Sequence, residues 1–380
     1  MNSGEKLGLY IHIPFCKSKC VYCDFCSFPD KNNDFKAYGC ALKKEADLYS
    51  SRFKGRKITS VFVGGGTPSI IGGDILSDIL HHVRSLFEFS DDVEISVEAN
   101  PDSFDEYFAE SMKAAGVNRI SLGLQSANDR LLKNLGRPHN LEDFCKAAQV
   151  AKKYFDNVNF DLMLGVEGQT LADVRETLEY VLAFSPTHLS VYGLILERGT
   201  LLYKKVKSGK VVLPDSDQTA DMYDLTVELL KSHCFHRYEV SNFAIDGYGC
   251  RHNLNYWERG EYLGIGLAAH GYFNGVRYAN VRRLENYYNK ISVATRPVSY
   301  RQKISQKDAC FEYVMLGLRK TSGFNVDEFK RNTGADFFDV YGKEFEKLSQ
   351  QGLLCVRENC IYIPSERFYV ANSILTEFVR

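Results

Sequence analysis

Three cysteines near the start of the chain constrain its fold more than any other feature. Cys16, Cys20 and Cys23 follow a CxxxCxxC spacing within a run of apolar and aromatic residues. Thiolates are soft ligands that select zinc, copper(I) or iron–sulfur clusters. A loop this short can hold three corners of a cubane [4Fe-4S] cluster, which leaves one iron without a protein ligand. That open iron can chelate the amino and carboxylate groups of a small molecule.

Two other kinds of metal site use four cysteines. Cys26 adds a fourth thiol, so a structural zinc site and a ferredoxin cluster both need weighing. Structural zinc sites usually take their ligands from two separated pairs, and no further CxxC follows this loop. A chain of 380 residues is also much larger than an electron-transfer ferredoxin requires. The spacing therefore favours a cluster held by three thiolates, with Cys26 outside the ligand set.

The composition is that of an ordinary globular protein, and it limits the classes of partner and the cellular compartment that we expect. The chain is 44% apolar and 25% charged, and its net charge of -1 does not favour binding to nucleic acid. Eleven cysteines and an opening segment without a secretory pattern predict a cytoplasmic protein with reduced thiols. No apolar run approaches the roughly 20 residues that span a bilayer, so we expect no transmembrane segment. Peripheral contact with a membrane stays open.

Short apolar, β-branched runs alternate with longer amphipathic segments over the first half of the chain. The runs predicted as strands are 8–13, 60–63, 92–98, 118–124, 157–164 and 187–195. The segments predicted as helices are 35–52, 73–88, 102–115, 141–155 and 170–184. Repeated βα units predict a parallel sheet, and six strands predict an α/β fold with a partial (β/α)6 TIM-like barrel.

Polar residues recur where the predicted strands end. A GGGTP run, residues 64–68, follows the second strand, and the later strands carry Glu98, Gln125, Asp161 and Ile195. Parallel barrels place their chemistry on the face formed by the carboxyl ends of the strands. Taken singly, the glycine run could be a tight turn, and the polar side chains could cap helices. Their recurrence on one face predicts a single shared cavity.

Ten segments, in order along the chain, resemble one known family. They are YIHIPFCKSKCVYCDF, VFVGGGTPS, VEANP, RISLGLQS, LGRPH, FDLMLGV, HLSVYGLIL, YEVSNFA, CRHNLNYW and YLGIGLAAHGY. The chain is similar to the oxygen-independent coproporphyrinogen III oxidase (HemN-like) family of the radical S-adenosylmethionine (SAM) superfamily, and within it to the HemW type. The resemblance implies a [4Fe-4S] cluster and SAM as cofactors. It also implies one-electron cleavage of SAM to methionine and a 5′-deoxyadenosyl radical.

The resemblance assigns roles to individual residues. Cys16, Cys20 and Cys23 would hold the cluster. The residues implied for the first SAM are Tyr10, Gly65, Gly66, Thr67 and Glu98. Those matching a second SAM site are Gln125, Arg137, Asp161 and Ile195. His12, just before the cluster loop, could face the cluster or a tetrapyrrole, or could be a buried and satisfied histidine.

Two functions follow from the resemblance, and whether the chain is an enzyme stays open between them. HemW-type proteins are haem chaperones that carry haem as cargo to acceptor proteins, and their HNxxYW box corresponds here to residues 252–257. Imidazole is a good axial ligand to haem iron, so His252 is a candidate ligand, although it could instead pin a loop. The alternative is an oxidase that decarboxylates coproporphyrinogen III, but the long N-terminal extension of true oxidases is missing. Either function implies haem or a porphyrinogen as ligand and a reductant such as flavodoxin or ferredoxin.

The last part of the chain has a different pattern. We expect a barrel core with its extension over 1–290, a polar linker over 291–306 and a small domain over 307–380. The predicted elements of that domain are helices at 307–319, 325–332, 335–351 and 365–380, with a hairpin over 353–363 that turns at Glu358 and Asn359. Helices followed by a two-stranded wing predict a winged-helix-like α+β domain, as in the C-terminal domain of the HemN-like family. Its charges are mixed, so we expect a cover or docking domain without a role in DNA binding.

Overall fold

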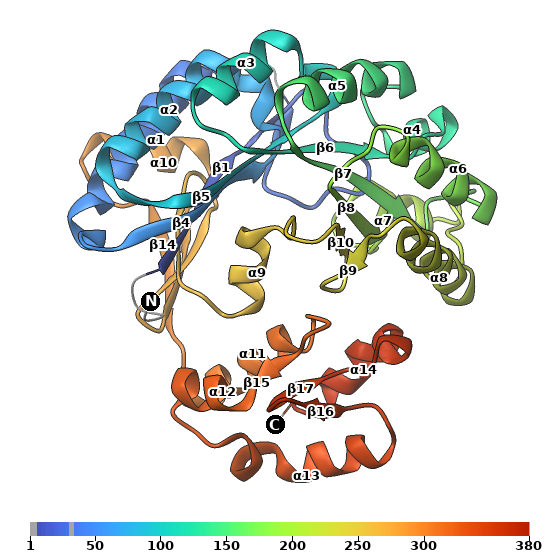
Figure 1. The fold of residues 1–380 in the computed structure, drawn as a ribbon. Helices are drawn as coiled ribbons and strands as arrows, with labels where there is room; N and C mark the ends of the chain where they lie inside the picture. The colour runs from blue at the N-terminus through green and yellow to red at the C-terminus, as the bar shows by residue number, and fades with distance from the viewer. Residues whose placement is uncertain (1–5, 30–33, 380) are drawn as a thin grey trace.

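The computed structural model describes residues 6–29 and 34–379. Its centre is a twelve-stranded sheet with strand order β14-β13-β12-β11-β1-β4-β5-β6-β7-β8-β10-β9. Figure 1 shows this sheet curving beneath an arc of helices, with a smaller domain below it. The architecture confirms the predicted α/β fold with a partial barrel and a small C-terminal domain.

Six neighbouring parallel strands form the barrel, and all six were predicted. They are β1 (Lys6–Ile13), β4 (Lys57–Gly65), β5 (Glu88–Ala99), β6 (Arg119–Gln125), β7 (Asn157–Leu164) and β8 (His188–Gly193). The five predicted helices are also present and cover the outer face of the sheet (Figure 1). They are α1 (Phe35–Ser50), α2 (Gly73–Leu86), α3 (Glu106–Ala114), α5 (Leu141–Tyr154) and α6 (Leu171–Leu182).

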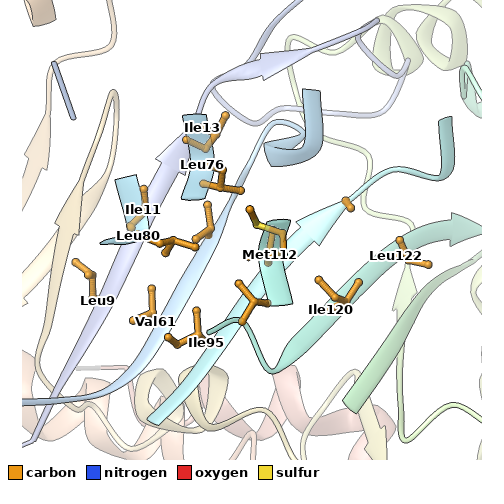
Figure 2. Packing of buried hydrophobic residues seen from close by; sticks show 14 of the residues in the cluster. Leu9, Ile11, Ile13, Val61, Leu76, Leu80, Ile95, Met112, Ile120 and Leu122 are labelled. Carbon is orange, nitrogen blue, oxygen red and sulfur yellow. The ribbon is translucent and has the colours of Figure 1, made fainter. Parts of the chain in front are cut away.

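Alternation along each strand separates an apolar outer face from a polar inner face. In β1, Leu9, Ile11 and Ile13 are fully buried, whereas Tyr10 and His12 point to the opposite side of the strand. Figure 2 shows the outer side chains of β1, β4, β5 and β6 packed against residues of α2 and α3. Burying this layer stabilises the barrel by roughly 1.5–3 kcal/mol for each large apolar side chain. The inner face is left to polar residues.

Side-chain caps fix where the outer helices begin. Asp105 accepts a hydrogen bond from the Phe108 amide at the start of α3. Asn140 and Thr170 start α5 and α6, each with a reciprocal capping box. Such caps satisfy amides that a helix leaves unpaired, and each is worth about 1 kcal/mol. The chain therefore turns from strand to helix at defined positions on the carboxyl face.

The sheet extends beyond the barrel on both sides. β11 (Tyr262–Ile265) pairs in parallel with β1, and antiparallel strands then follow it to the edge. These are β12 (His270–Phe273), β13 (Val276–Asn280) and β14 (Val298–Lys303), and on the far side β10 (Asn242–Ala244) and β9 (His236–Arg237). The segment 291–306, predicted as a linker, contains the end of α10 (Leu284–Ser292) and the whole of β14, which pairs with β13. Five of the six residues of β14 are exposed, so this edge strand has the polar composition of a linker.

Several elements were not predicted from the sequence. They are β2 (Phe15–Cys16), β3 (Phe28–Pro29), α4 (Asp129–Leu135), α7 (Leu201–Lys207), α8 (Ser216–Ser232) and α9 (Arg251–Trp257). All but α8 have at most seven residues, too few to show a helical or strand period. Figure 1 places α9 across the sheet from α1 and α2, between the barrel and the C-terminal domain.

The C-terminal domain has its own hydrophobic core and three-stranded sheet. Its predicted helices are confirmed as α11 (Gln306–Gly317), α12 (Val326–Thr333) and α13 (Phe337–Gln350). β16 (Cys355–Arg357) and β17 (Cys360–Tyr362) form the predicted hairpin, and β15 (Phe324–Asn325) pairs with β17. Glu358 and Asn359 have φ values of 49° and 63°, as a two-residue hairpin turn requires.

The final predicted helix is shorter than expected. A 3-10 turn, η4 (Ser365–Val370), comes first and α14 (Ala371–Thr376) follows, while residue 380 lies outside the described residues. Ion pairs connect this domain to the barrel: Glu312 on α11 contacts Arg259 at 3.0 Å and Arg277 at 2.7 Å. Glu312 and Arg259 are largely buried, so these pairs are screened less than surface pairs.

Candidate cofactor site

A cavity of about 340 Å³ lies at the carboxyl ends of the barrel strands. It brings together residues from the cysteine loop and from β4, β5, β6 and β7. Ten predicted site residues line it: Cys16, Cys20, Cys23, Gly65, Gly66, Thr67, Glu98, Gln125, Arg137 and Asp161. We call this the thiol cavity. Three other predicted residues, Tyr10, Ile195 and His252, do not line it.

Backbone hydrogen bonds hold the cysteine loop against the barrel. The Val21 amide donates to the Leu135 carbonyl at 3.1 Å, and the Phe28 amide donates to the Pro14 carbonyl at 2.7 Å. The Lys19 ammonium crosses the loop and donates to the Phe25 carbonyl at 2.6 Å. The loop is therefore anchored at both ends and braced within, which fixes where its thiols point.

The glycine run supports the loop and does not leave its amides free. The Gly65 amide donates to Glu98 Oε2 at 3.2 Å, the Gly66 amide to the Ile13 carbonyl at 2.8 Å and the Thr67 amide to the Phe15 carbonyl at 2.7 Å. A Cβ at Gly66 would lie 2.4 Å from the Phe15 carbonyl oxygen. Glycine is needed here for close packing against the cysteine loop. The Gly65, Gly66 and Thr67 amides are therefore already engaged within the protein.

Positive charge and hydrogen bonds surround the three thiols. Arg137 Nη1 lies 3.5 Å from Cys20 Sγ, while its Nη2 donates to Asn100 Oδ1 at 2.7 Å. Burial raises the pKa of the Cys16 thiol, whereas hydrogen bonding to Thr67 and Ser27 lowers it. Metal ligation requires thiolates, and a neighbouring guanidinium stabilises that charged form.

Three thiols along one cavity wall match a cluster better than a single ion. In the described part of the chain, no group of three or more His, Cys, Asp or Glu side chains converges closely enough to hold one metal ion. The three thiols nevertheless lie near one another: besides burial, Cys20 contributes to raising the pKa of Cys16, and Cys20 and Cys16 contribute to raising the pKa of Cys23. Thiolates spaced around a common volume fit a cubane, whose irons are bound one by one.

Two carboxylates face the thiol cavity from neighbouring strands. Burial raises the pKa of Glu98 to about 7, and Asp161 adds to the shift, while the Gly65 amide opposes it. Asp161 is held by Asn159 Nδ2 at 2.7 Å and by Ser121 Oγ at 3.2 Å. The site therefore contains one carboxyl group, that of Glu98, with a pKa near neutrality, and a second, that of Asp161, which hydrogen bonds hold in place. Both can accept hydrogen bonds from ligand hydroxyl or ammonium groups.

Gln125 and Asp161 do not cap the following helices. The caps of α4 and α6 are Asn128 and Thr170, so the capping interpretation is wrong here. Gln125 instead has a φ of 77°, in the left-handed region that a non-glycine residue seldom adopts. Such strain persists only where the surrounding structure enforces it, and it concentrates at functional sites.

A second cavity of about 380 Å³ adjoins the thiol cavity and shares Phe25, Gly65 and Glu98 with it. We call it the adjoining cavity. Tyr10 lines it, and the Tyr10 hydroxyl hydrogen-bonds His12 Nδ1 at 2.9 Å. His12 Nε2 donates to the Cys26 carbonyl at 2.9 Å, and burial lowers the pKa of His12 to about 4. His12 is thus the buried, satisfied histidine that was one of its three interpretations.

The two remaining predicted residues lie elsewhere. Ile195 follows β8 and is 71% exposed. His252, on α9, is fully buried, and its ring hydrogen-bonds Ser60 Oγ and the Tyr256 hydroxyl, both at 2.9 Å. Burial lowers its pKa to about 3, so the ring is neutral. In this conformation both ring nitrogens are engaged and the ring has no exposed surface, so nothing in the geometry presents His252 to a ligand, and its role as a haem ligand stays a prediction.

Sequence reasoning missed residues that complete both cavities. Asn100 lines the thiol cavity and accepts a hydrogen bond from Arg137. His270 and Arg282 line the adjoining cavity. Asn100 stands in the VEANP segment and His270 in the YLGIGLAAHGY segment, so both were within matched motifs. Only the fold shows that they face a cavity.

Comparison with known proteins places the chain in a family. The Radical SAM superfamily model matches residues 10–181, and the HemN C-terminal domain model matches residues 304–366. The heme chaperone HemW of Bacillus subtilis (strain 168) is 32% identical over 372 residues, which are 97% of this chain and 98% of that protein. The chain belongs to the HemW family. The Mycobacterium tuberculosis (strain H37Rv) heme chaperone HemW is 36% identical over 331 residues, 84% of this chain and 83% of that protein.

The fold of this HemW family member also matches a solved structure. Coproporphyrinogen III oxidase (HemN) from Escherichia coli superimposes with a TM-score of 0.86 at 23% identity, over 99% of this chain and 90% of that one. At this identity the match shows a shared fold. None of the helices in the described part of the chain combines the length and apolar character that crossing a bilayer requires.

Proposed function

We propose that this protein is a haem chaperone that binds haem and passes it to acceptor proteins. The observation that carries the proposal is similarity to HemW chaperones along nearly the whole chain, 32% over 97% of its length for the Bacillus subtilis protein. Similarity of that extent covers the thiol cavity, the adjoining cavity and the C-terminal domain together.

A [4Fe-4S] cluster and SAM are the cofactors that the thiol cavity fits. Cys16, Cys20 and Cys23 would hold the cluster, and when bound the pair supplies one-electron cleavage of the sulfonium. Arg137 lies beside Cys20 and would balance thiolate charge. Glu98, with a pKa of about 7, can exchange a proton at neutral pH while it orients a ligand hydroxyl.

Acceptor proteins and a reductant such as flavodoxin or ferredoxin complete the proposal. We place the protein in the cytoplasm, where thiols stay reduced. All eleven cysteines lie within the described residues and are free thiols, which agrees with that compartment. No nucleic acid is proposed as a partner, because the net charge of -1 offers no electrostatic basis for it.

A second candidate is oxygen-independent coproporphyrinogen III oxidation. The observation that favours it is the thiol cavity itself, because three thiols, Glu98 and Asp161 line the same cavity. A protein that only carries haem has little physical need for a cavity of this kind. The shared fold with Escherichia coli HemN is compatible with either function.

One experiment separates the two functions. Cluster-reconstituted protein is titrated anaerobically with haem while the Soret band is followed, and the same sample is assayed for SAM cleavage and for conversion of coproporphyrinogen III. We expect stoichiometric haem binding without decarboxylated product. Turnover of coproporphyrinogen with weak haem binding would establish the oxidase and overturn the chaperone.

A further inference from the structure

We propose that the adjoining cavity is the haem site and that His270 is the axial ligand of the iron. This inference rests on the proposed function and names the site at which it acts. It replaces the prediction for His252, whose ring is buried and fully hydrogen-bonded.

The state of each histidine ring singles out His270. Three of the nine histidines, His12, His188 and His252, are buried with both ring nitrogens hydrogen-bonded. His139 is buried, and its Nε2 donates to the Leu124 carbonyl at 3.2 Å. Four others lie on the outer surface of α2, α8 and β9: His81, His82, His233 and His236.

His270 alone combines an open ring with a cavity. It stands at the start of β12, its side chain is exposed, and it lines the adjoining cavity. Among the described residues, neither of its ring nitrogens has a hydrogen-bond partner, in contrast to His12 across the same cavity. An imidazole with a free nitrogen is the group that haem iron takes as an axial ligand.

The other walls suit a porphyrin. Aromatic rings of Tyr10, Phe62, Tyr256 and Tyr262 line the cavity, and Phe25 at its rim is 64% exposed. Ring faces of this kind pack against a flat macrocycle. An exposed aromatic at a cavity mouth is apolar surface that a bound porphyrin would cover.

Charge at the rim suits the propionates of haem. Arg282 lines the cavity beside Cys26, and within the described residues it forms no ion pair with a carboxylate. A guanidinium without a carboxylate partner can bind a propionate with two parallel hydrogen bonds. Asp24 also lines the cavity, so we expect the propionates to lie toward Arg282 and away from Asp24.

A buried network holds the turn that presents His270. Glu45 on α1 accepts hydrogen bonds from the Gly266 amide at 2.7 Å, Asn280 Nδ2 at 2.7 Å and the Tyr287 hydroxyl at 2.7 Å. Between Gly266 and His270, Ala268 has a φ of 58°, a strained backbone like that of Gln125 in the thiol cavity. The turn is therefore rigid and preorganised for a ligand.

The test compares His270→Ala with His236→Ala, whose side chain is 63% exposed and far along the sheet order from β12. Each cluster-loaded protein is titrated anaerobically with haem. His270→Ala should lower haem affinity at least tenfold and shift the Soret band, and added imidazole should restore the band position. His236→Ala should match wild type. Arg282→Gln should weaken binding a few-fold without moving the band, because it alters a propionate contact only.

The outcomes distinguish this inference from the function on which it rests. Wild-type haem binding together with an unchanged Soret band and affinity in His270→Ala would overturn the ligand assignment and leave the chaperone proposal standing. A wild-type protein that binds no haem would overturn both. Because the His270 side chain is exposed and unbonded among the described residues, its removal should leave the unfolding temperature unchanged, and circular dichroism checks this on the same sample.

Discussion

The amino and carboxyl ends of the barrel's inner face differ in what fills them, a helix at one end and a cavity at the other. At the amino end, α9 fills the barrel: Glu94 accepts hydrogen bonds from the Arg251 and His252 amides, and His252 bonds Ser60. At the carboxyl end, three thiols and two carboxylates line an open cavity, and Arg137 Nε has no partner among the described residues.

This difference separates structural polar residues from functional ones. A hydrogen-bond network packed around a helix rigidifies a core and specifies one arrangement, whereas polar groups that face a cavity are available to a ligand. The HNxxYW box lies in the first region, although its histidine and aromatics look like a haem site in sequence. His270, in a less conspicuous segment, lies in the second.

The largest expected effect comes from removing a cluster thiol at the carboxyl end of the barrel. Cys20→Ala should abolish cluster binding, because two thiolates cannot hold a cubane. Cys26→Ala is the matched control, since Cys26 lines the adjoining cavity and not the thiol cavity. Iron and acid-labile sulfide content after anaerobic reconstitution measures both. Loss of the cluster in Cys26→Ala would show that the ligand set includes a fourth thiol.

At the amino end of the barrel, we expect a substitution to lower the stability of the protein without affecting cluster binding. His252→Ala should lower the free energy of unfolding by about 3 kcal/mol, because it leaves a cavity and two unpaired buried hydroxyl groups. Urea denaturation measures this, and cluster content should stay normal in the folded fraction. His236→Ala should change stability by less than about 0.5 kcal/mol. A stable His252→Ala protein with impaired haem binding would break the comparison.

The glycine run can be tested as a packing element. Gly66→Ala should cost about 2 kcal/mol and reduce cluster loading, because the new Cβ would push the Phe15 carbonyl and the cysteine loop. Gly193→Ala is the control, since a Cβ there meets no atom within 4 Å. Equal stability of the two variants would mean that Gly66 serves a ligand and not the loop.

A smaller effect is expected in the pH dependence of stability. The folded pKa of Glu98, about 7, lies above its ordinary value of 4.5, so the folded state binds more protons between these values. Stability of the cluster-free protein should therefore fall as pH rises from about 4.5 through 7. Glu98→Gln should remove about 3 kcal/mol of that fall, since one pKa unit corresponds to about 1.4 kcal/mol. Identical pH profiles for wild type and Glu98→Gln would contradict the buried carboxyl.

Much of the fold was predictable because its signals are local. Alternating apolar residues in β1 and amphipathic spacing in α2 need only a short window of sequence, and the cysteine spacing fixed the thiol cavity's position. The sequence of β14 predicts a linker because an exposed edge strand carries no apolar face. α9 was missed because seven residues give no period.

The site was predictable only in part. Glu98, Gln125 and Asp161 follow strands of one parallel sheet, so topology alone brings them together. The states of His252 and His270 depend on β4, β11 and β12, which are distant in sequence from one another. Whether a histidine ring is engaged is a property of the packed structure, and no spacing rule reports it.

The central claim is that the chain carries haem without transforming a porphyrinogen, and haem transfer tests it most directly. Haem-loaded, cluster-reconstituted protein is mixed anaerobically with a haem-free acceptor protein, and the acceptor's Soret band is followed. We predict transfer from wild type and from folded His252→Ala, and much less from His270→Ala, which binds haem at least tenfold more weakly. Failure of the wild-type protein to release haem to any acceptor, with conversion of coproporphyrinogen III in the same sample, would contradict the account.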